Sequence, residues 1–360
     1  IVLGISESTF IQQFFGIFGR NLGYLNYLSL AIIAISICIF SSPNFSSTLL
    51  RAMKWNLYFV LTYAFLQMIG IDFAKRKEAI KLGSFFGNTD FLSAYLGLSV
   101  ILLFGLLIIE KVYRLENIIL IILSLFVIVQ TRAIQGFALI LIGLILFSIY
   151  FINDYGKNRI IKFSYYSSLV IFSFYLAIGS LGHGFFGKYL YKQSVAARGD
   201  YWRTGIDMFF QSPIYGLGLD SYFENFTINR DLKTFNRNTG EIADNAHNIF
   251  IQFASTGGLL LATSYLMIIG MALFSYFRFK RNHKESTFSK IDLIFVLYVG
   301  FLAQQFISID HVGLSIWGWA FSSTLILINN NIQTKAANFK NYVMGILLGL
   351  IGFVIGAGMF

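Results

Sequence analysis

Long hydrophobic runs separated by short polar segments dominate this chain. Runs of this length cross a hydrocarbon core of roughly 30 Å as α-helices. The pattern predicts an all-α, polytopic membrane helix bundle, taken as one integral-membrane domain over residues 1–360. About ten spans are expected, near Leu22–Phe40, Trp55–Ile71, Phe91–Ile109, Asn117–Gln130, Gly136–Ile152, Tyr165–Gly182, Ile249–Phe277, Ile291–Ile309, Val312–Ile328 and Tyr342–Phe360.

Composition agrees with this class. Hydrophobic residues make up 56% of the chain and charged residues 12%, and the mean hydropathy is +0.69, outside the range of soluble domains. The formal net charge of +10 lies mainly in short loops between spans, which indicates contact with anionic lipid head groups rather than nucleic acid. The chain begins at Ile1 without a signal-peptide pattern, so we expect that leading spans are missing.

Basic residues in the short loops predict the orientation, because such residues favour the cytoplasmic side. If the spans alternate, one side carries Arg51, Lys54, Lys111, Arg114, Lys157, Arg159, Lys162, Arg278, Lys280, Arg281, Lys284, Lys290, Lys335 and Lys340. The large loop of residues 183–248 then faces outward, together with Arg20, Arg132 and the Asp310–His311 loop. The cluster Lys75, Arg76, Lys77 and Lys81 also falls outside, where it either snorkels at the interface or meets an anion.

The large outer loop is polar and aromatic, and Arg198–Phe210 within it predicts a short amphipathic helix. At 100° per residue, Asp200, Arg203 and Asp207 share one face, so Arg203 is expected to pair with carboxylates. Arg198 lies on the side of Trp202, away from these acids, which favours binding of a phosphate group by its guanidinium. The segment Ser212–Gly218 predicts a turn that reverses the chain.

His247 is the candidate for proton transfer. Asp244 or Asn245 is expected to cap the helix that follows, so the positive end of that helix dipole lowers the imidazole pKa and keeps the ring neutral near pH 7. The alternative is a structural histidine at a helix start. Arg132 ends a hydrophobic run on the outer side, where it either snorkels or binds an anion.

Several kinds of chemistry lack a signal in the sequence. There is no HExxH, CxxC or Walker motif, and GxSxG does not occur in a suitable context. The single cysteine, Cys38, excludes an internal disulfide, and the four histidines fall in different loops, so we expect no metal site and no cofactor. Carboxylates are nearly absent from the predicted spans, which argues against an ion-coupled transporter.

Three separated segments resemble the O-antigen ligase and polymerase superfamily, the membrane glycosyltransferases that use undecaprenyl-diphosphate glycans. Gly83–Leu96, GSFFGNTDFLSAYL, is similar to the family's GTFGNPN-x-LA-x-YL signature, with Thr89 and Asp90 in place of Pro-Asn. Thr131–Gly136 is similar to its TR-x-x-x-G element, with Ala133 in place of a common serine. Arg198–Gly218, followed by Asn245–Asn248 and Gly257–Gly258, resembles its large outer loop and next span.

The resemblance implies a metal-independent, inverting glycosyltransferase in the bacterial inner membrane, with its site facing the periplasm. It implies that Arg132 and Arg198, with a weaker contribution from Arg203, hold the diphosphate of the donor. His247 would activate the acceptor hydroxyl, with Asn245, Asn248 and Trp202 in support. The implied partners are an undecaprenyl-diphosphate-linked glycan, a lipid A core or other glycan acceptor, and membrane lipids.

Two alternatives to a ligase remain open. A polysaccharide polymerase has the same donor and chemistry and differs only in its acceptor. A lipid-linked glycan flippase is more distant, because it predicts paired repeats and charged residues in a central cavity, which the sequence does not show.

Overall fold

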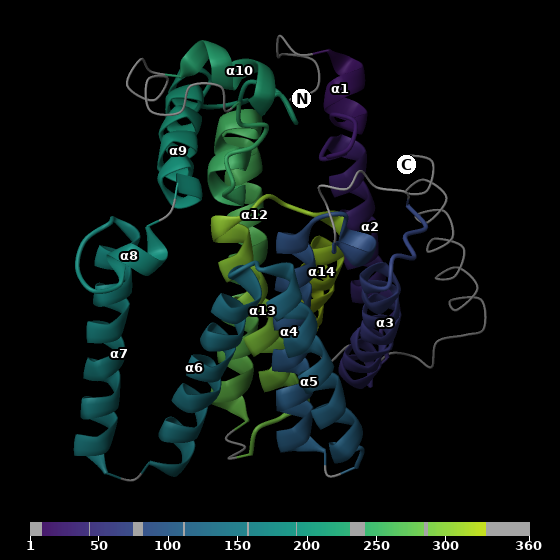
Figure 1. Cartoon of the computed structure of the whole chain (residues 1–360), viewed down its shortest axis with the longest axis vertical. Coiled ribbons are helices and arrows are strands. Elements are labelled where there is room, and N and C mark those ends of the chain that lie inside the picture. Colours follow the sequence, from purple (N-terminus) through teal and green to yellow (C-terminus); the bar gives the residue numbers. More distant parts are fainter. Residues whose placement is uncertain are drawn as a thin grey trace. The chain divides into compact units, whose positions relative to one another are not determined.

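Helices account for all the regular secondary structure of the described residues in the computed structural model, which describes residues 9–42, 44–74, 82–110, 112–156, 158–191, 193–230, 242–283 and 287–328 (Figure 1). The predicted last span, Tyr342–Phe360, and the basic cluster Lys75–Lys81 lie outside them. In chain order the helices are α1 (Phe10–Phe15), α2 (Tyr24–Phe40), α3 (Phe45–Met68), η2 (Ser84–Phe86), α4 (Thr89–Ile109), α5 (Arg114–Thr131), α6 (Gln135–Tyr155), α7 (Arg159–Ser180), α8 (Gly187–Leu190), α9 (Gln193–Gln211), α10 (Tyr222–Asn229), α12 (Ile249–Asn282), α13 (Lys290–Ile307) and α14 (Val312–Leu327).

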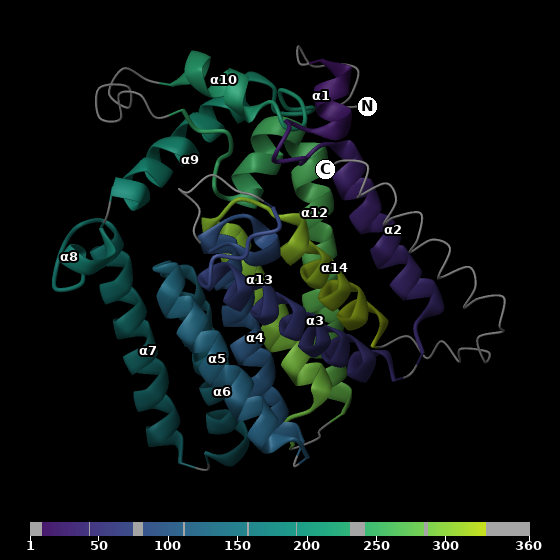
Figure 2. The ribbon, with the colours of Figure 1, turned by 45° about the vertical axis from the view of Figure 1, so that its right-hand side comes forward.

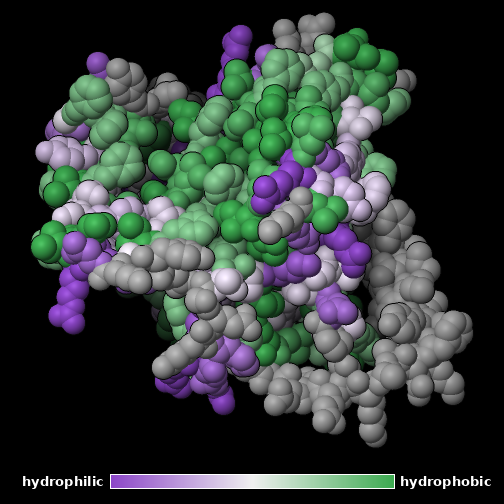
Figure 3. Space-filling model, turned by 90° about the horizontal axis from the view of Figure 1, so that it is seen from below, coloured by the Kyte–Doolittle hydropathy of each residue, from purple (hydrophilic) through white to green (hydrophobic). Residues whose placement is uncertain are grey.

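The expected class, a polytopic helical membrane protein, is confirmed. In the described part of the chain six helices are long and apolar enough to cross a membrane, namely α4, α5, α6, α7, α12 and α13. Two predicted spans correspond to shorter apolar helices, α2 and α14, and another falls on the longer but more polar α3. Many large hydrophobic side chains of the described residues are exposed, and in the view of Figure 3 they cover much of the visible surface.

The chain forms two compact units. Unit 1 comprises the described residues within 1–25, 148–265 and 305–310, and unit 2 comprises those within 26–147, 266–304 and 311–360. The long helix α12 therefore contributes its first half to unit 1 and the remainder to unit 2.

The centre of unit 2 is α4, which is buried on every side from Phe91 to Leu103. A helix that is hydrophobic all round is stable only inside a bundle, and its few polar groups must find partners there. Ser99 donates to the Tyr95 carbonyl at 2.9 Å, and the Tyr95 hydroxyl donates to the Met53 carbonyl of α3 at 3.3 Å. The polar groups of the buried helix thus join it to its neighbour.

Two of the three segments that resemble the superfamily meet in unit 2. The Ser93 hydroxyl of α4 accepts from the Gly136 backbone N–H at 3.0 Å and donates to the Ala133 carbonyl at 3.3 Å. A Cβ on Gly97 would lie 2.6 Å from the Gly136 carbonyl oxygen, so only glycine permits this approach. The glycine of the TR-x-x-x-G element, Gly136, is likewise a packing residue, because a Cβ on it would lie 2.5 Å from the Ser93 carbonyl oxygen.

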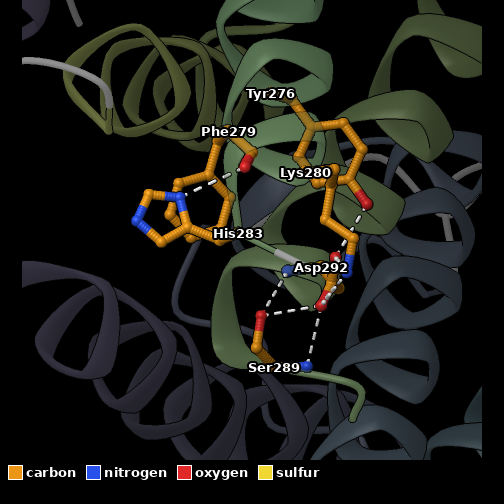
Figure 4. Close-up of polar contacts among 6 residues, drawn as sticks. All are labelled: Tyr276, Phe279, Lys280, His283, Ser289 and Asp292. Atoms are coloured by element: carbon orange, nitrogen blue, oxygen red, sulfur yellow. Dashed lines mark hydrogen bonds and ion pairs between the residues drawn. The ribbon is translucent and has the colours of Figure 1, made fainter. Parts of the chain in front are cut away.

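A buried carboxylate fastens the α12–α13 connection (Figure 4). Asp292 of α13 accepts from the Tyr276 hydroxyl at 2.8 Å, and it forms a salt bridge with Lys280 at 3.1 Å. It also accepts from the Ser289 backbone N–H at 2.9 Å and hydroxyl at 2.7 Å, while its own N–H donates back to that hydroxyl. This reciprocal cap occupies both carboxylate oxygens, so Asp292 has a structural role.

Candidate active site

The described part of the large loop has a hydrophobic core of its own within unit 1. Met208 of α9, Tyr222 and Phe226 of α10, and Ala243 and Ala246 are buried together, with Tyr201, Leu217 and Ile251 packed against them. Both ribbon views show α9, α10 and the start of α12 gathered at this core (Figure 2). The predicted helix Arg198–Phe210 is confirmed as part of the longer α9. The packing of this core therefore holds α9, α10 and the segment before α12 together, and these elements carry the polar residues of the loop.

A break in α12 anchors the segment that the sequence predicts as a simple turn. Gly258 leaves helical geometry, with φ 65° and ψ −169°, and frees carbonyl groups of the preceding turn. The backbone N–H groups of Leu217 and Gly218 donate to the carbonyls of Ser255 and Thr256 at 3.0 and 2.9 Å. In return, the Leu259 N–H donates to the Pro213 carbonyl at 2.8 Å. The turn thus replaces helix hydrogen bonds that the break removes.

Gly258→Ala is expected to destabilise the protein, because its backbone angles are essentially restricted to glycine, a cost of about 1–3 kcal/mol before any steric clash. A Cβ there would also lie 2.3 Å from the Ile214 carbonyl oxygen. Thermal unfolding in detergent should show a lower Tm. The matched control is Gly270→Ala in the same helix, where a Cβ meets no atom within 4 Å. An unchanged Tm in Gly258→Ala would contradict the structural role of the break.

The segment Asp244–Asn248 leads into α12 and presents His247. Asn248, which is buried, caps the helix, because its side-chain oxygen accepts from the N–H groups of Phe250 and Ile251 at 3.0 and 3.2 Å. The expectation that Asp244 or Asn245 caps α12 is therefore wrong. Asn245 instead accepts from the His247 N–H at 2.9 Å, which supports His247 in a left-handed conformation with φ 53°.

His247 is partly buried, and three charged residues, Arg198, Asp244 and Arg20, act on its pKa. Its pKa is lowered to about 4, mainly by burial and next by the Arg198 guanidinium, and the smaller effects of Asp244 and Arg20 oppose each other. Its ring also lies 5.4 Å from the ring of Tyr201. The lowered pKa matches the prediction, but the cause differs, since His247 precedes the capping residue and so lies outside the first turn of the helix. The imidazole is neutral near pH 7 and has a guanidinium as its neighbour.

The N-terminal segment adds a residue that sequence reasoning missed. Arg20 forms a salt bridge with Asp244 at 2.6 Å, three residues before His247. The same segment is tied to the loop by the Ile17 N–H, which donates to Asp220 at 2.6 Å, and by Gln12, which donates to Glu224 at 2.7 Å. The prediction that Arg20 faces the outer side was the available signal, but a contact across more than 220 residues cannot be inferred from one sequence.

Arg20→Ala is expected to raise the pKa of His247, because the change removes a cation and leaves the Asp244 carboxylate, which favours the protonated ring. The acid limb of the activity profile should then move to higher pH. Asp244→Asn should move it the opposite way, and Arg20→Lys should leave it near its original position. The measurement is transfer rate against pH for all three variants. A profile that is unaltered in both Arg20→Ala and Asp244→Asn would remove Arg20 from the site.

The other predicted residues lie in different places. Trp202 is partly buried against Phe306, with ring centroids 5.8 Å apart, and Arg203 is exposed on α9. Arg132 belongs to unit 2, where it is exposed and ends α5 in a left-handed conformation with φ 57°. Unit 1 therefore brings together Arg198, His247 and Asn245, whereas convergence with Arg132 remains a prediction.

The fold and the loop define a multi-pass helical membrane protein with a structured polar site. Residues 92–266, or 175 of the 360, match the model of the O-Antigen ligase family. Over this region the chain is similar to the O-antigen ligase family, in agreement with the resemblance of its motifs. The match includes Arg132, Arg198 and His247. A search of curated proteins found no significant match.

Proposed function

We propose that the chain is an O-antigen ligase-type glycosyltransferase that moves a glycan from undecaprenyl diphosphate to a sugar hydroxyl of lipid A core or a related surface glycan. The single observation that carries the proposal is a neutral histidine beside an arginine, His247 and Arg198, within the matched region. One group accepts a proton near pH 7 and the other binds phosphate oxygens, which are the two tasks of this reaction.

In the proposed reaction, the neutral His247 imidazole takes the proton of the acceptor hydroxyl as its oxygen attacks the anomeric carbon. The bond from that carbon to the lipid diphosphate breaks, and the bonding electrons leave with the diphosphate. Arg198 and Arg132 stabilise the negative charge on the departing group, and Arg203 contributes more weakly. Attack opposite the leaving group inverts the anomeric carbon. The catalytic step needs no metal ion and no cofactor.

Two buried polar groups among the predicted site residues of unit 1 support the proposal. The Asn245 side-chain nitrogen and the Trp202 indole nitrogen are buried and lack a hydrogen-bond partner among the described residues. Buried donors of this kind are costly unless a ligand satisfies them, so a glycan oxygen is a suitable partner. In this proposal Asn248 acts indirectly, because it begins the helix that follows His247.

The proposed location is the bacterial inner membrane, with the site toward the periplasm. The distribution of Lys and Arg among the short loops supports this orientation, because basic residues favour the cytoplasmic side. A donor with a polyprenyl tail must also keep that tail in lipid while its diphosphate reaches the membrane surface, where a large polar loop is available.

The test is reconstitution of the full chain with purified lipid-linked glycan and two acceptors, lipid A core and a second lipid-linked glycan. Transfer to lipid A core supports a ligase. Transfer only to the other glycan chain supports the alternative, a polysaccharide polymerase with the same chemistry. Absence of transfer to either acceptor, from protein that binds the donor, would contradict the proposal.

Activity is expected to survive a chelator, since two guanidiniums take the place of a metal ion in stabilising the diphosphate. The measurement is transfer rate with and without EDTA in the reconstituted system. A loss of rate in EDTA that an added divalent ion restores would contradict the metal-free mechanism.

A further inference from the structure

A groove of about 670 Å³ lies between α3 and α5, both of which belong to unit 2. Apolar side chains line most of it, including Leu61 and Phe65 from α3 and Ile119, Leu120 and Leu123 from α5. Charged and aromatic side chains line only one end, where Tyr58, Tyr113, Arg114 and Glu116 are found. The groove therefore has one polar end and an apolar remainder.

Two contacts define how the groove is oriented. The Tyr58 hydroxyl donates to Glu116 at the polar end, and Phe65 stacks on Phe126 toward the apolar end, with ring centroids 6.2 Å apart. Seven residues of α3 separate Tyr58 from Phe65, which corresponds to roughly 10 Å of helix. The groove thus runs along two spans, from a polar rim into their hydrocarbon-facing part.

The cations near the groove differ in whether an acid pairs with them. Lys54, Lys280 and Lys290 each have an acid, since they form salt bridges with Glu116, Asp292 and Glu110 at 2.8, 3.1 and 3.0 Å. Arg114 also lines the rim, is exposed, and makes no hydrogen bond or ion pair with the described residues. A guanidinium at a lipid-facing rim, with an apolar groove beneath it, is suited to a phosphate that carries a hydrocarbon tail.

We propose that the α3–α5 groove binds one anionic phospholipid of the cytoplasmic leaflet, with an acyl chain between Leu61, Phe65, Ile119 and Leu123 and the head-group phosphate on Arg114. Tyr58 and Tyr113 lie at the level of the head groups, where amphipathic aromatic side chains are favoured. The leaflet follows from Arg51, Lys54 and Arg114, which belong to the set predicted to face the cytoplasm. The site is independent of the proposed transfer reaction.

The test is native mass spectrometry of the full chain in detergent with added phosphatidylglycerol or phosphatidylcholine. The wild-type protein should retain one phosphatidylglycerol in preference to phosphatidylcholine. Arg114→Ala should weaken retention of phosphatidylglycerol about tenfold, the scale of a charge-assisted hydrogen bond. Ile119→Trp, at a half-exposed position, should fill the groove and prevent retention of both lipids.

The matched control is Arg159→Ala. Arg159 is the first residue of α7, as Arg114 is of α5, and it is exposed, but it is not among the residues that line the α3–α5 groove. This variant should retain lipid as the wild type does. Equal retention by wild type and Arg114→Ala would overturn the proposal, as would equal retention of the two lipids. Displacement of phosphatidylglycerol by a polyprenyl phosphate at equal concentration would also overturn it, because the groove would then hold the tail of a glycan carrier.

Discussion

Replacing His247 with asparagine is expected to lower the transfer rate about 10²–10⁴-fold, the range that general-base catalysis contributes. Asparagine is the sharpest substitution, since it tolerates the left-handed backbone at this position, φ 53°, and so preserves the loop while it removes the base. Donor binding should remain close to wild type. The measurement is the transfer rate at saturating donor, with donor affinity determined separately.

The pH dependence gives a second readout for the same group. Because burial and Arg198 lower the pKa of His247 to about 4, the ring accepts a proton throughout the neutral range and loses this ability only as the pH falls through about 4. The matched control is His183→Ala, which changes an exposed histidine of the same unit. A near-normal transfer rate in His247→Asn would exclude the general-base role of His247, even if the arginine variants behave as expected.

Arg198→Ala is expected to reduce transfer about 10²–10³-fold, the cost of losing one group that stabilises developing negative charge. Donor affinity should fall as well, since the guanidinium binds phosphate oxygens before and during the reaction. Arg198→Lys should recover only part of the activity, because a lysine keeps the charge but loses the planar pair of donors. The pKa of His247 should rise in Arg198→Ala, which moves the acid limb to higher pH.

The control for Arg198 is Arg203→Ala on the same helix. Arg203 is exposed and is expected to pair with carboxylates of α9, so its loss should affect stability more than donor affinity. If Arg203→Ala weakens donor binding selectively while Arg198→Ala does not, the assignment of the two arginines is reversed. Arg132→Ala is expected to weaken donor binding as Arg198→Ala does, and comparison of the two tests whether both contact one diphosphate.

The sequence predicts the helices of this chain well because their signal is local. A run of about twenty apolar residues has one stable form in a bilayer, since each backbone N–H and C=O must be satisfied inside the segment. For the same reason the predicted span Ile249–Phe277 begins at the same residue as α12, and Phe91–Ile109 falls within α4. The glycine of the TR-x-x-x-G element also marks a close approach, since Gly136 lies against Gly97 of α4.

The loop was predicted less well. The pattern from Ser212 to Gly218 predicts only a reversal, but its hydrogen bonds go to a break in α12 that lies about 40 residues later. The cap of α12 was placed at Asp244 or Asn245, because several adjacent residues have suitable side chains. Only the hydrogen bonds that Asn248 accepts from Phe250 and Ile251 identify it as the cap. In both cases the local sequence allows more than one arrangement of hydrogen bonds.

By itself, the sequence determined the membrane-helix class, because that class follows from local composition. Through the resemblance of its motifs it also indicated the family and the candidate residues His247 and Arg198. Only the tertiary structure decided why the imidazole is neutral and which residues surround it. Burial and the field of Arg198 depend on distances in space, and the salt bridge of Arg20 with Asp244 joins parts of the chain that are far apart in sequence. Electrostatic energies follow those distances, which one sequence does not contain.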